Sequence, residues 1–171
     1  GGAWRLCLAL DGAHSLACAL VGTLVSVSWR GWQSDCPLAE GTLGAALLTP
    51  TRLFVKQALA AVKSGGVHAL AHITGGGLTE NLPRVLPEGL GADINLDAWE
   101  LPEVFKWLAA TGGMAEAELL KTFNSGIGMI LSVDANEADR LKALLEAEGE
   151  TVSVLGAVTA GEGVRYSGAL I

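Results

Sequence analysis

The chain has 171 residues, of which half are apolar and 17% are charged. Such a composition predicts one folded domain with a sizeable core and argues against intrinsic disorder. The formal net charge is −7, and the sequence has no dense patch of lysine and arginine. Nucleic-acid binding is therefore disfavoured, because phosphate neutralisation needs clustered cations.

The cysteines and the longest apolar stretch point to a reducing, cytoplasmic compartment. Cys7, Cys18 and Cys36 are odd in number and lie at no metal-ligand spacing, so they indicate neither a disulfide framework nor a metal site. Residues 16–29 form the longest uncharged apolar run, which is too short and too mixed to span a bilayer. A basic residue before this run gives it some likeness to a signal peptide, but polar residues interrupt the pattern. The chain begins with Gly-Gly rather than Met, which is typical of a fragment or a processed chain.

The first part of the chain predicts a buried strand followed by two helices. Residues 4–10 have the apolar pattern of a strand, and the run 16–29 is interpreted as a helix after a polar turn. Residues 31–44 are rich in glycine and are interpreted as a loop. Thr49-Pro50 has the cap-then-proline form of a helix start. That helix should run to about Lys63 and end at Ser64-Gly65-Gly66, with a buried stripe of Phe54, Ala58 and Ala61 or Val62.

The rest of the chain alternates strands and helices. Predicted strands cover residues 67–73, 92–96, 127–133, 151–159 and 164–171, and predicted helices cover 78 to about 87, 101–112, 115–123 and a last segment after residue 137. Asp134-Ala135-Asn136-Glu137 has the form of a capping box for that last helix, which should bury Ala138, Leu141, Leu144 and Leu145 and end at Gly149. Gly161-Glu162-Gly163 should join the last two strands into a hairpin. No repeat or linker divides the chain, so we expect one α+β domain over residues 1–171, with helices against a small mixed sheet.

A strand that runs into three glycines is the strongest candidate for a functional site. Residues 67–73 alternate as a half-buried strand does, and Gly75, Gly76 and Gly77 then remove every side chain from the turn. A strand, a bare turn and a helix start form a nest of free backbone N–H groups, which suits a phosphate or another oxyanion. His72 and Thr74 flank the turn and could reach that anion. The alternative is a tight connection that needs positive φ, with His72 as a structural residue.

Residues 72–87, His-Ile-Thr-Gly-Gly-Gly-Leu-Thr-Glu-Asn-Leu-Pro-Arg-Val-Leu-Pro, resemble the hallmark of aminoimidazole ribonucleotide synthetase, the phosphoribosylformylglycinamidine cyclo-ligase of purine biosynthesis. Further matches follow in the right order at residues 48–52 (Leu-Thr-Pro-Thr-Arg), 102–108 (Pro-Glu-Val-Phe-Lys-Trp-Leu) and 122–129 (Thr-Phe-Asn-Ser-Gly-Ile-Gly-Met). The similarity is to the C-terminal half of that enzyme. It covers residues 39–171 closely, whereas residues 1–38 match less well.

The resemblance implies an α/β/α layered domain that supplies one wall of an active-site cleft. It also implies ATP-dependent conversion of formylglycinamidine ribonucleotide to aminoimidazole ribonucleotide, in which the formyl oxygen is activated and the amidine nitrogen attacks it. ATP and Mg²⁺ would bind mainly through an N-terminal half that this sequence lacks, and the full-length enzyme would be a homodimer. The fragment alone should lack turnover. Such chemistry needs N–H donors for the developing oxyanion and a group that exchanges protons near neutral pH, for which histidine is the obvious type.

Carried over to this sequence, the resemblance assigns His72 to acid–base catalysis. It assigns Thr74 and the N–H groups of Gly75, Gly76 and Gly77 to the substrate phosphate or the activated amide. Three further residues are weaker candidates for substrate binding: Asn81, Arg84 and Asn124. Arg84 could equally be a helix-pairing charge, and Asn124 could belong to a plain strand entry.

The first loop departs from the family pattern. Residues 8–15, Leu-Ala-Leu-Asp-Gly-Ala-His-Ser, resemble a strand followed by the family's Gly-x-His-Ser-Asn-Gly loop. This likeness makes His14 a second catalytic candidate and Ser15 a substrate-binding one. Leu16-Ala17 stands where the family has Asn-Gly, which suggests a reading-frame slip or a decayed copy. The alternatives are a degenerate, non-catalytic anion-binding domain, or another superfamily member such as the amidotransferase-coupled ligase of the same pathway or a kinase of thiamine or selenide metabolism.

Overall fold

The computed structural model describes residues 4–11, 33–35, 40–48 and 50–171, which form a six-stranded mixed sheet with helices packed against it. The strands are β1 (Trp4–Asp11), β2 (Val67–His72), β3 (Leu90–Asn95), β4 (Ile127–Asp134), β5 (Val152–Ala160) and β6 (Gly163–Ser167). The α-helices are α2 (Leu43–Leu47), α3 (Val55–Ser64), α4 (Gly77–Asn81), α5 (Glu103–Gly112), α6 (Glu116–Thr122) and α7 (Ala138–Ala147), and short 3₁₀ turns occupy Pro83–Val85, Leu96–Ala98 and Ala135–Glu137. The strand order is β2-β4-β1-β5-β3-β6, and every neighbouring pair is antiparallel except β3 and β6.

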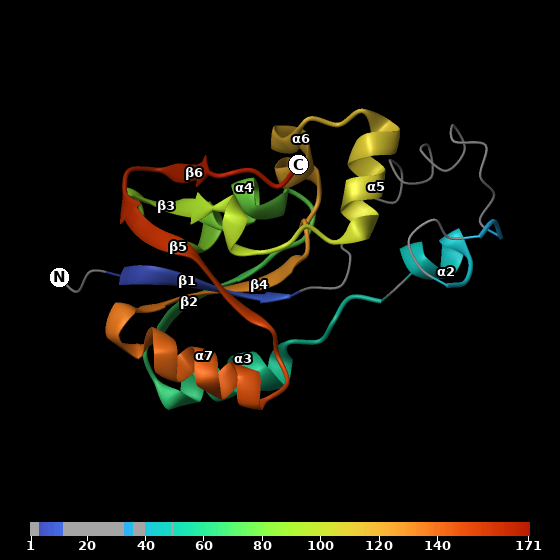
Figure 1. Ribbon diagram of the computed structural model, residues 1–171. Helices are drawn as coiled ribbons and strands as arrows, with labels where there is room; N and C mark the ends of the chain where they lie inside the picture. Colours follow the sequence, from blue (N-terminus) through green and yellow to red (C-terminus); the bar gives the residue numbers. More distant parts are fainter. Residues whose placement is uncertain (1–3, 12–32, 36–39, 49) are drawn as a thin grey trace.

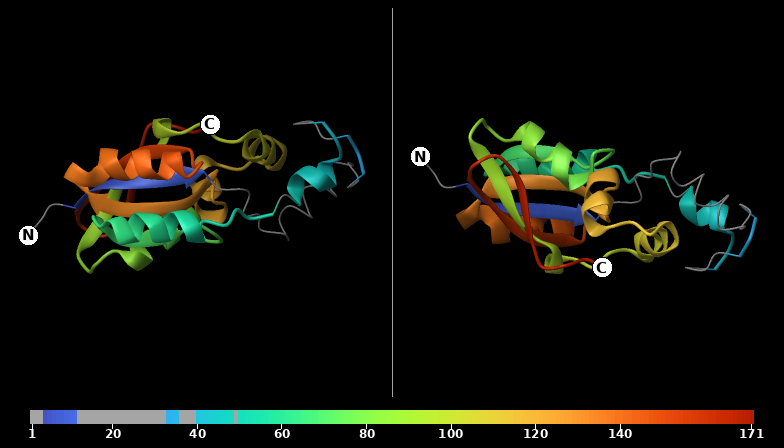
Figure 2. Two further views of the ribbon diagram at one scale, coloured as in Figure 1. Left: turned by 90° about the horizontal axis from the view of Figure 1, so that it is seen from below. Right: turned by 90° about the horizontal axis from the view of Figure 1, so that it is seen from above.

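Helices lie on both sides of the sheet, so the predicted α+β fold with α/β/α layering is confirmed. α3 and α7 lie side by side against one face, and α4 lies on the opposite side (Figure 1; Figure 2). The two-residue period of β1 divides its side chains between the two layers. Leu8 and Leu10 belong to the apolar cluster formed with α3 and α7, whereas Cys7 and Ala9 belong to the cluster that includes α4. All four side chains are fully buried, as the prediction of a buried strand requires.

A third apolar cluster joins α2, α5 and α6. Leu43 and Leu47 of α2 belong to the same buried cluster as Phe105 and Leu108 of α5. The sequence analysis places the first residues of α2 in a loop, and this interpretation is wrong. The Thr42 hydroxyl oxygen accepts from the Ala45 N–H (3.2 Å) and caps the helix. Thr42 is therefore the local sequence feature that marks the start of α2.

The predicted C-terminal hairpin is wrong, because β3 lies between β5 and β6. The link between the two strands crosses the start of β3, where Gly91 has no side chain. A Cβ at Gly91 would lie 2.5 Å from the carbonyl oxygen of Gly163 and 2.7 Å from that of Gly161. The Gly161 N–H donates to the Gly89 carbonyl (2.9 Å). The missing side chain at Gly91 therefore allows a connection that looks locally like a tight hairpin turn.

The helix expected from Thr49-Pro50 begins at Val55 instead. Residues 50–54 are not helical, because a long-range contact holds them: the Arg52 guanidinium binds the turn after α7. The buried stripe of α3 contains Ala61 rather than Val62, which is 44% exposed. The helix ends where the sequence predicts, at Gly65 with φ 82°.

The capping box expected at residues 134–137 does not form. Asp134 makes no side-chain capping bond, and its carboxylate accepts from His68 Nε2 at 2.8 Å on the neighbouring edge strand β2. Within the last helix, Ala138, Leu141 and Leu145 are buried as expected, while Leu144 is only partly buried.

The helix predicted from residue 78 to about 87 is α-helical only to Asn81 and continues as a 3₁₀ turn over Pro83–Val85, and the last strand ends at Ser167 rather than Ile171. The other described elements agree with the predictions to within about two residues. The predicted helix over residues 16–29 and the candidate residues His14 and Ser15 lie outside the described residues.

Candidate functional site

The three glycines after β2 form a bend in which each position has a different environment. Gly76 and Gly77 have φ values of +95° and +56°, which glycine adopts without strain. A Cβ at Gly77 would lie 2.0 Å from the Leu120 carbonyl oxygen and 2.7 Å from that of Phe123. Gly77 is therefore required for the close approach of the end of α6. Gly75 is exposed, and nothing lies within 4 Å of where its Cβ would be.

Two of the three glycine amides are available to a ligand. The Gly77 N–H donates to the Thr74 carbonyl oxygen at 3.0 Å, which closes the turn. Among the described residues, no protein acceptor takes the N–H of Gly75 or Gly76. The sequence predicts three free backbone N–H groups in this turn, whereas the structure leaves two, those of Gly75 and Gly76.

A carboxylate lies beside this pair of amides. A Cβ at Gly76 would lie 2.8 Å from Glu80 Oε2, which accepts from Arg84 Nη2 at 3.2 Å. The negative charge of Glu80 opposes an anion at Gly76, and the positive charge of Arg84 offsets it. Arg84 therefore pairs along the helix, which is the alternative that the sequence analysis leaves open for this residue.

Asn81 holds the bend from inside. Its side chain is nearly buried, at 7% exposure, and its Nδ2 donates to the carbonyl oxygens of Gly77 (2.8 Å), Gly75 (3.1 Å) and Thr74 (3.4 Å). Its Oδ1 accepts from Arg84 Nη1 (3.3 Å). Because one amide group takes three carbonyls of the bend, those carbonyls point inward and the free N–H groups of the turn remain on its outer side.

A hydroxyl pair fixes α4 to the edge of the sheet. The Thr79 Oγ1 lies 2.9 Å from the Tyr166 hydroxyl on β6 and donates to the Leu120 carbonyl oxygen at 3.3 Å. Burial raises the pKa of Tyr166, and its hydrogen bond with Thr79 partly lowers that pKa. Sequence reasoning missed this anchor, because Thr79 and Tyr166 are far apart in the chain.

Asn124 lies in a second turn that contacts the bend. It is 1% exposed, and its Oδ1 accepts from the Gly126 N–H (3.4 Å). Ser125, which lies between Asn124 and Gly126, is fully buried and has a left-handed φ of +51°. Its carbonyl oxygen accepts a hydrogen bond from Trp99 Nε1 at 2.9 Å. Its hydroxyl has no hydrogen-bond partner among the described residues. The Asn124 side chain therefore shapes the strand entry, which agrees with the structural alternative for this residue.

The imidazole of His72 points away from the bend. Ala71 and Ile73 belong to the cluster on the α4 side of the sheet, so the side chain of His72 between them faces the α3 side. There it is exposed, and its ring meets that of Phe54 edge-on, with centroids 6.4 Å apart at 67°. The structure thus separates the predicted cluster: Thr74, the glycines, Asn81 and Arg84 come together, and His72 lies on the other face of the same strand end.

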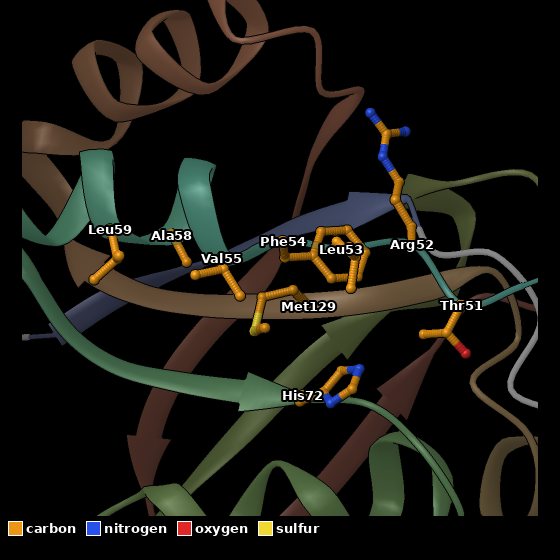
Figure 3. Close-up of a pocket in the computed structure, with 9 residues that line it drawn as sticks. All are labelled: Thr51, Arg52, Leu53, Phe54, Val55, Ala58, Leu59, His72 and Met129. Carbon is orange, nitrogen blue, oxygen red and sulfur yellow. The ribbon is translucent and has the colours of Figure 1, made fainter.

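His72 lines an apolar cavity of about 370 Å³ between the sheet and the segment that leads into α3. Figure 3 shows His72 and Met129 on neighbouring strands, with the residues before and within α3 opposite them. The lining residues are Thr51, Arg52, Leu53, Phe54, Val55, Ala58, Leu59, His72 and Met129. A volume of this size lies within the range of small-ligand pockets. The sequence analysis does not predict this cavity, because its walls come from three separate segments.

An ion pair between a partly exposed arginine and a buried carboxylate holds one wall of this cavity in place. Arg52 Nη2 lies 3.2 Å from Glu150 Oε2 and donates to the Gly149 carbonyl oxygen at 3.0 Å. The Glu150 side chain is completely buried, whereas that of Arg52 is 40% exposed. The pair ties the segment before α3 to the turn after α7 and so sets the position of Phe54 against His72.

Two further features concern ligands and membranes. In the parts of the chain that the structure describes, no group of three or more His, Cys, Asp and Glu side chains is arranged to hold a metal ion. The same parts contain no helix with the length and apolar character needed to cross a bilayer.

Solved structures with the same fold include three bacterial proteins. The chain is similar to E. coli HypE, a hydrogenase maturation protein (20% identity, TM-score 0.61, covering 98% of this chain and 47% of that one). It is similar to thiamine-monophosphate kinase from Stenotrophomonas maltophilia K279a (16% identity, TM-score 0.66, covering 99% and 52%). It is also similar to the protein tt0281 from Thermus thermophilus (23% identity, TM-score 0.57, covering 95% and 48%). The chain therefore spans about half the length of each of these proteins.

The family comparison agrees with the resemblance found in the motifs. A family model described as "AIR synthase related protein, C-terminal domain" matches residues 8–168, which is nearly the whole chain and includes the glycine bend, the cavity and both turns. The chain belongs to the family of AIR synthase related proteins, as a C-terminal domain.

Proposed function

We propose that this chain is the C-terminal domain of an ATP-dependent cyclo-ligase that converts formylglycinamidine ribonucleotide to aminoimidazole ribonucleotide in purine biosynthesis. Membership of the family and the resemblance of residues 72–87 to the cyclo-ligase support the proposal. The observation that carries it is the pair of unused N–H groups on Gly75 and Gly76. The proposal implies a cytoplasmic protein that has no nucleic-acid or membrane partner and is a homodimer at full length.

In this proposal the bend binds an oxyanion of the substrate. The N–H groups of Gly75 and Gly76 donate to the phosphate or to the oxygen on which charge develops, and the Thr74 hydroxyl adds a third donor. Donors that are already oriented before the reaction stabilise a developing charge most effectively. Asn81, Arg84 and Asn124 then have supporting roles, since their side chains bind protein groups.

The resemblance alone assigns to His72 the exchange of the proton that the amidine nitrogen loses when the ring closes. Its imidazole lies on the face of the sheet opposite the bend, so His72 would not contact an anion held at Gly75 and Gly76. Histidine is suited to this exchange near neutral pH, and the exposure of His72 allows contact with a substrate. His14 and Ser15 remain candidates for the same cleft on the basis of the resemblance alone.

ATP and Mg²⁺ belong to the other half of the enzyme in this proposal. ATP supplies the phosphoryl group that activates the formyl oxygen. Among the described residues, no group of three or more acidic, histidine or cysteine side chains is arranged to hold a metal ion by itself. We therefore derive no step of this domain through the metal, and we expect the chain alone to have no turnover.

The proposal is tested by a titration of the ¹⁵N-labelled chain with ribose 5-phosphate. The amide resonances of Gly75 and Gly76 should shift and saturate, while that of Gly77 should move little because its N–H is already bonded. If the Gly75 and Gly76 resonances do not shift at millimolar ribose 5-phosphate, the bend is not an anion-binding site.

Turnover requires a chain in which the N-terminal half of an aminoimidazole ribonucleotide synthetase is fused ahead of Gly1. The fusion should convert formylglycinamidine ribonucleotide in the presence of ATP and Mg²⁺, and His72→Asn should lower kcat by about 10²- to 10⁴-fold. A fusion that binds phosphate but has no activity would favour the second candidate, a non-catalytic anion-binding domain. The sequence feature on its side is Leu16-Ala17, which stands where the family has Asn-Gly.

A further inference from the structure

The carboxylate of Glu80 lies against Gly76 of the bend. A Cβ at Gly76 would lie 2.8 Å from Glu80 Oε2 and 3.0 Å from Glu80 Cβ, so the glutamate side chain occupies the space that another residue at position 76 would need. The N and Cβ atoms of one residue are about 2.5 Å apart, which places Glu80 Oε2 within about 5 Å of the Gly76 nitrogen. The N–H on that nitrogen has no acceptor among the described residues.

One oxygen of this carboxylate is open to a ligand. The Glu80 side chain is 44% exposed. Its Oε2 accepts from Arg84 Nη2 at 3.2 Å, and no other side chain or backbone group in the described part of the chain donates to the carboxylate. Arg84 also donates to Asn81 Oδ1 at 3.3 Å. The guanidinium therefore holds Oε2 in place and leaves Oε1 without a donor.

The bend thus presents two neutral donors beside a charged acceptor. The donors are the N–H groups of Gly75 and Gly76, and the acceptor is Glu80 Oε1. A phosphate suits the two amides but is repelled by the carboxylate, because like charges at this separation repel. A ligand that suits all three groups carries an acceptor oxygen next to a positively charged N–H group. A protonated amidine supplies such an N–H group, since it is a planar cation that can bind a carboxylate as the fork of arginine does.

We propose that Glu80 binds the amidine of the substrate while the N–H groups of Gly75 and Gly76 bind the neighbouring formyl oxygen. This inference rests on the proposed function, and of the two oxygens named there it assigns to the bend the one on which charge develops, rather than the phosphate. Ring closure requires the amidine nitrogen to lie about 3–3.5 Å from the formyl carbon. Donors and an acceptor that are about 5 Å apart can hold both groups at once. Glu80 therefore orients the attacking nitrogen.

The test titrates the ¹⁵N-labelled chain with N-formylglycinamidine, which has the formyl and amidine groups without the ribose phosphate. The Gly75 and Gly76 resonances should shift and saturate. Glu80→Gln keeps the shape of the side chain and removes its charge, so it should raise the dissociation constant about ten-fold, the loss typical of a hydrogen bond to a charged group. For N-formylglycinamide, in which a neutral amide replaces the amidine, the two chains should differ much less.

Ribose 5-phosphate gives a readout of opposite sign. Glu80→Gln should lower its dissociation constant by roughly three- to ten-fold, because the variant removes a negative charge beside the amides. Damage to the bend would weaken the binding of both probes, so a gain for one and a loss for the other cannot come from a structural role of Glu80.

The matched control is Glu137→Gln, which removes the same charge elsewhere. Glu137 also pairs with an arginine close by in the sequence, because it accepts from Arg140 Nε at 2.6 Å. Arg140 lies on α7, which is on the other side of the sheet from α4 (Figure 1). This variant should change the dissociation constant of neither probe.

Two results would overturn the role of Glu80. One is an equal affinity of the unchanged and Glu80→Gln chains for N-formylglycinamidine, which is the result expected if Glu80 only pairs with Arg84. The other is a shift of Gly75 and Gly76 with ribose 5-phosphate but not with N-formylglycinamidine. The bend would then bind the phosphate, and the proposed function would stand without this inference. If neither probe shifts these resonances, the oxyanion site of the proposed function is itself wrong.

Discussion

Replacing Gly77 and Gly75 by alanine should have opposite consequences, although the two residues are neighbours in the same motif. The alanine Cβ at Gly77 would lie 2.0 Å and 2.7 Å from two carbonyl oxygens at the end of α6, and backbone atoms cannot rotate aside. The left-handed φ of +56° adds about 1–2 kcal/mol for an L side chain, and overpacking adds about 1–3 kcal/mol. We expect Gly77→Ala to lower the free energy of unfolding by about 2–5 kcal/mol.

Gly75→Ala is the matched control, because nothing lies within 4 Å of the new methyl group. Its effect should be neutral or a gain of up to about 1 kcal/mol through the unfolded chain. Urea unfolding followed by tryptophan fluorescence would give both values, and an unchanged slope would show that the compactness of the states is unaltered. Equal midpoints for Gly77→Ala and the unchanged protein would refute the assignment of Gly77 to helix packing.

Two further predictions concern buried groups. Burial raises the pKa of Cys7 from 9.0 to about 11, so between these pH values the unfolded state loses a proton that the folded state keeps. Stability should therefore fall as the pH rises from 9 to 11, by about 2–3 kcal/mol in total. Urea midpoints across that range should show this slope in the unchanged protein, and persistence of the full slope in Cys7→Ala would contradict it. Arg52→Ala should cost about 2–4 kcal/mol, since it leaves the buried Glu150 carboxylate without its cation. Lys56→Ala, which removes the exposed pair with Glu148, should cost much less, because water screens exposed ion pairs, and a similar loss for both variants in thermal unfolding would disprove the difference.

The glycine bend shows how one motif can combine two purposes. Gly77 serves the packing of α4 against α6, whereas the N–H groups of Gly75 and Gly76 are unused by the described residues. The Asn81 side chain donates to the carbonyl oxygens of Gly75 and Gly77 and so links the backbone segments that carry the free amides. Such an arrangement keeps hydrogen-bond donors in place before a ligand arrives, which is the condition for effective charge stabilisation.

The sequence by itself determined the elements whose signals are local. The alternating strand β2, the bend after it and the helices α5 and α6 follow from apolar periodicity and from glycine or proline at their ends. Pro102 precedes α5, and Gly113 ends it at φ +60°, as the spacing predicts. The fold class and the family follow from the same segments, because they depend on the order of the elements and on contiguous motifs rather than on distant contacts.

Only the tertiary structure decided which segments become neighbours. The insertion of β3 between β5 and β6 depends on the absence of a side chain at Gly91, and no local pattern reports that. Asp134 has the sequence of a helix cap, but His68 from β2 takes its carboxylate. The two-residue period of a strand predicts that the side chains of His72 and Ile73 point to opposite faces. Only the tertiary structure shows that the imidazole contacts Phe54 and lines an apolar cavity. Local sequence sets backbone preferences within a few residues, whereas these contacts join residues tens of positions apart and are chosen by the packing of the whole domain.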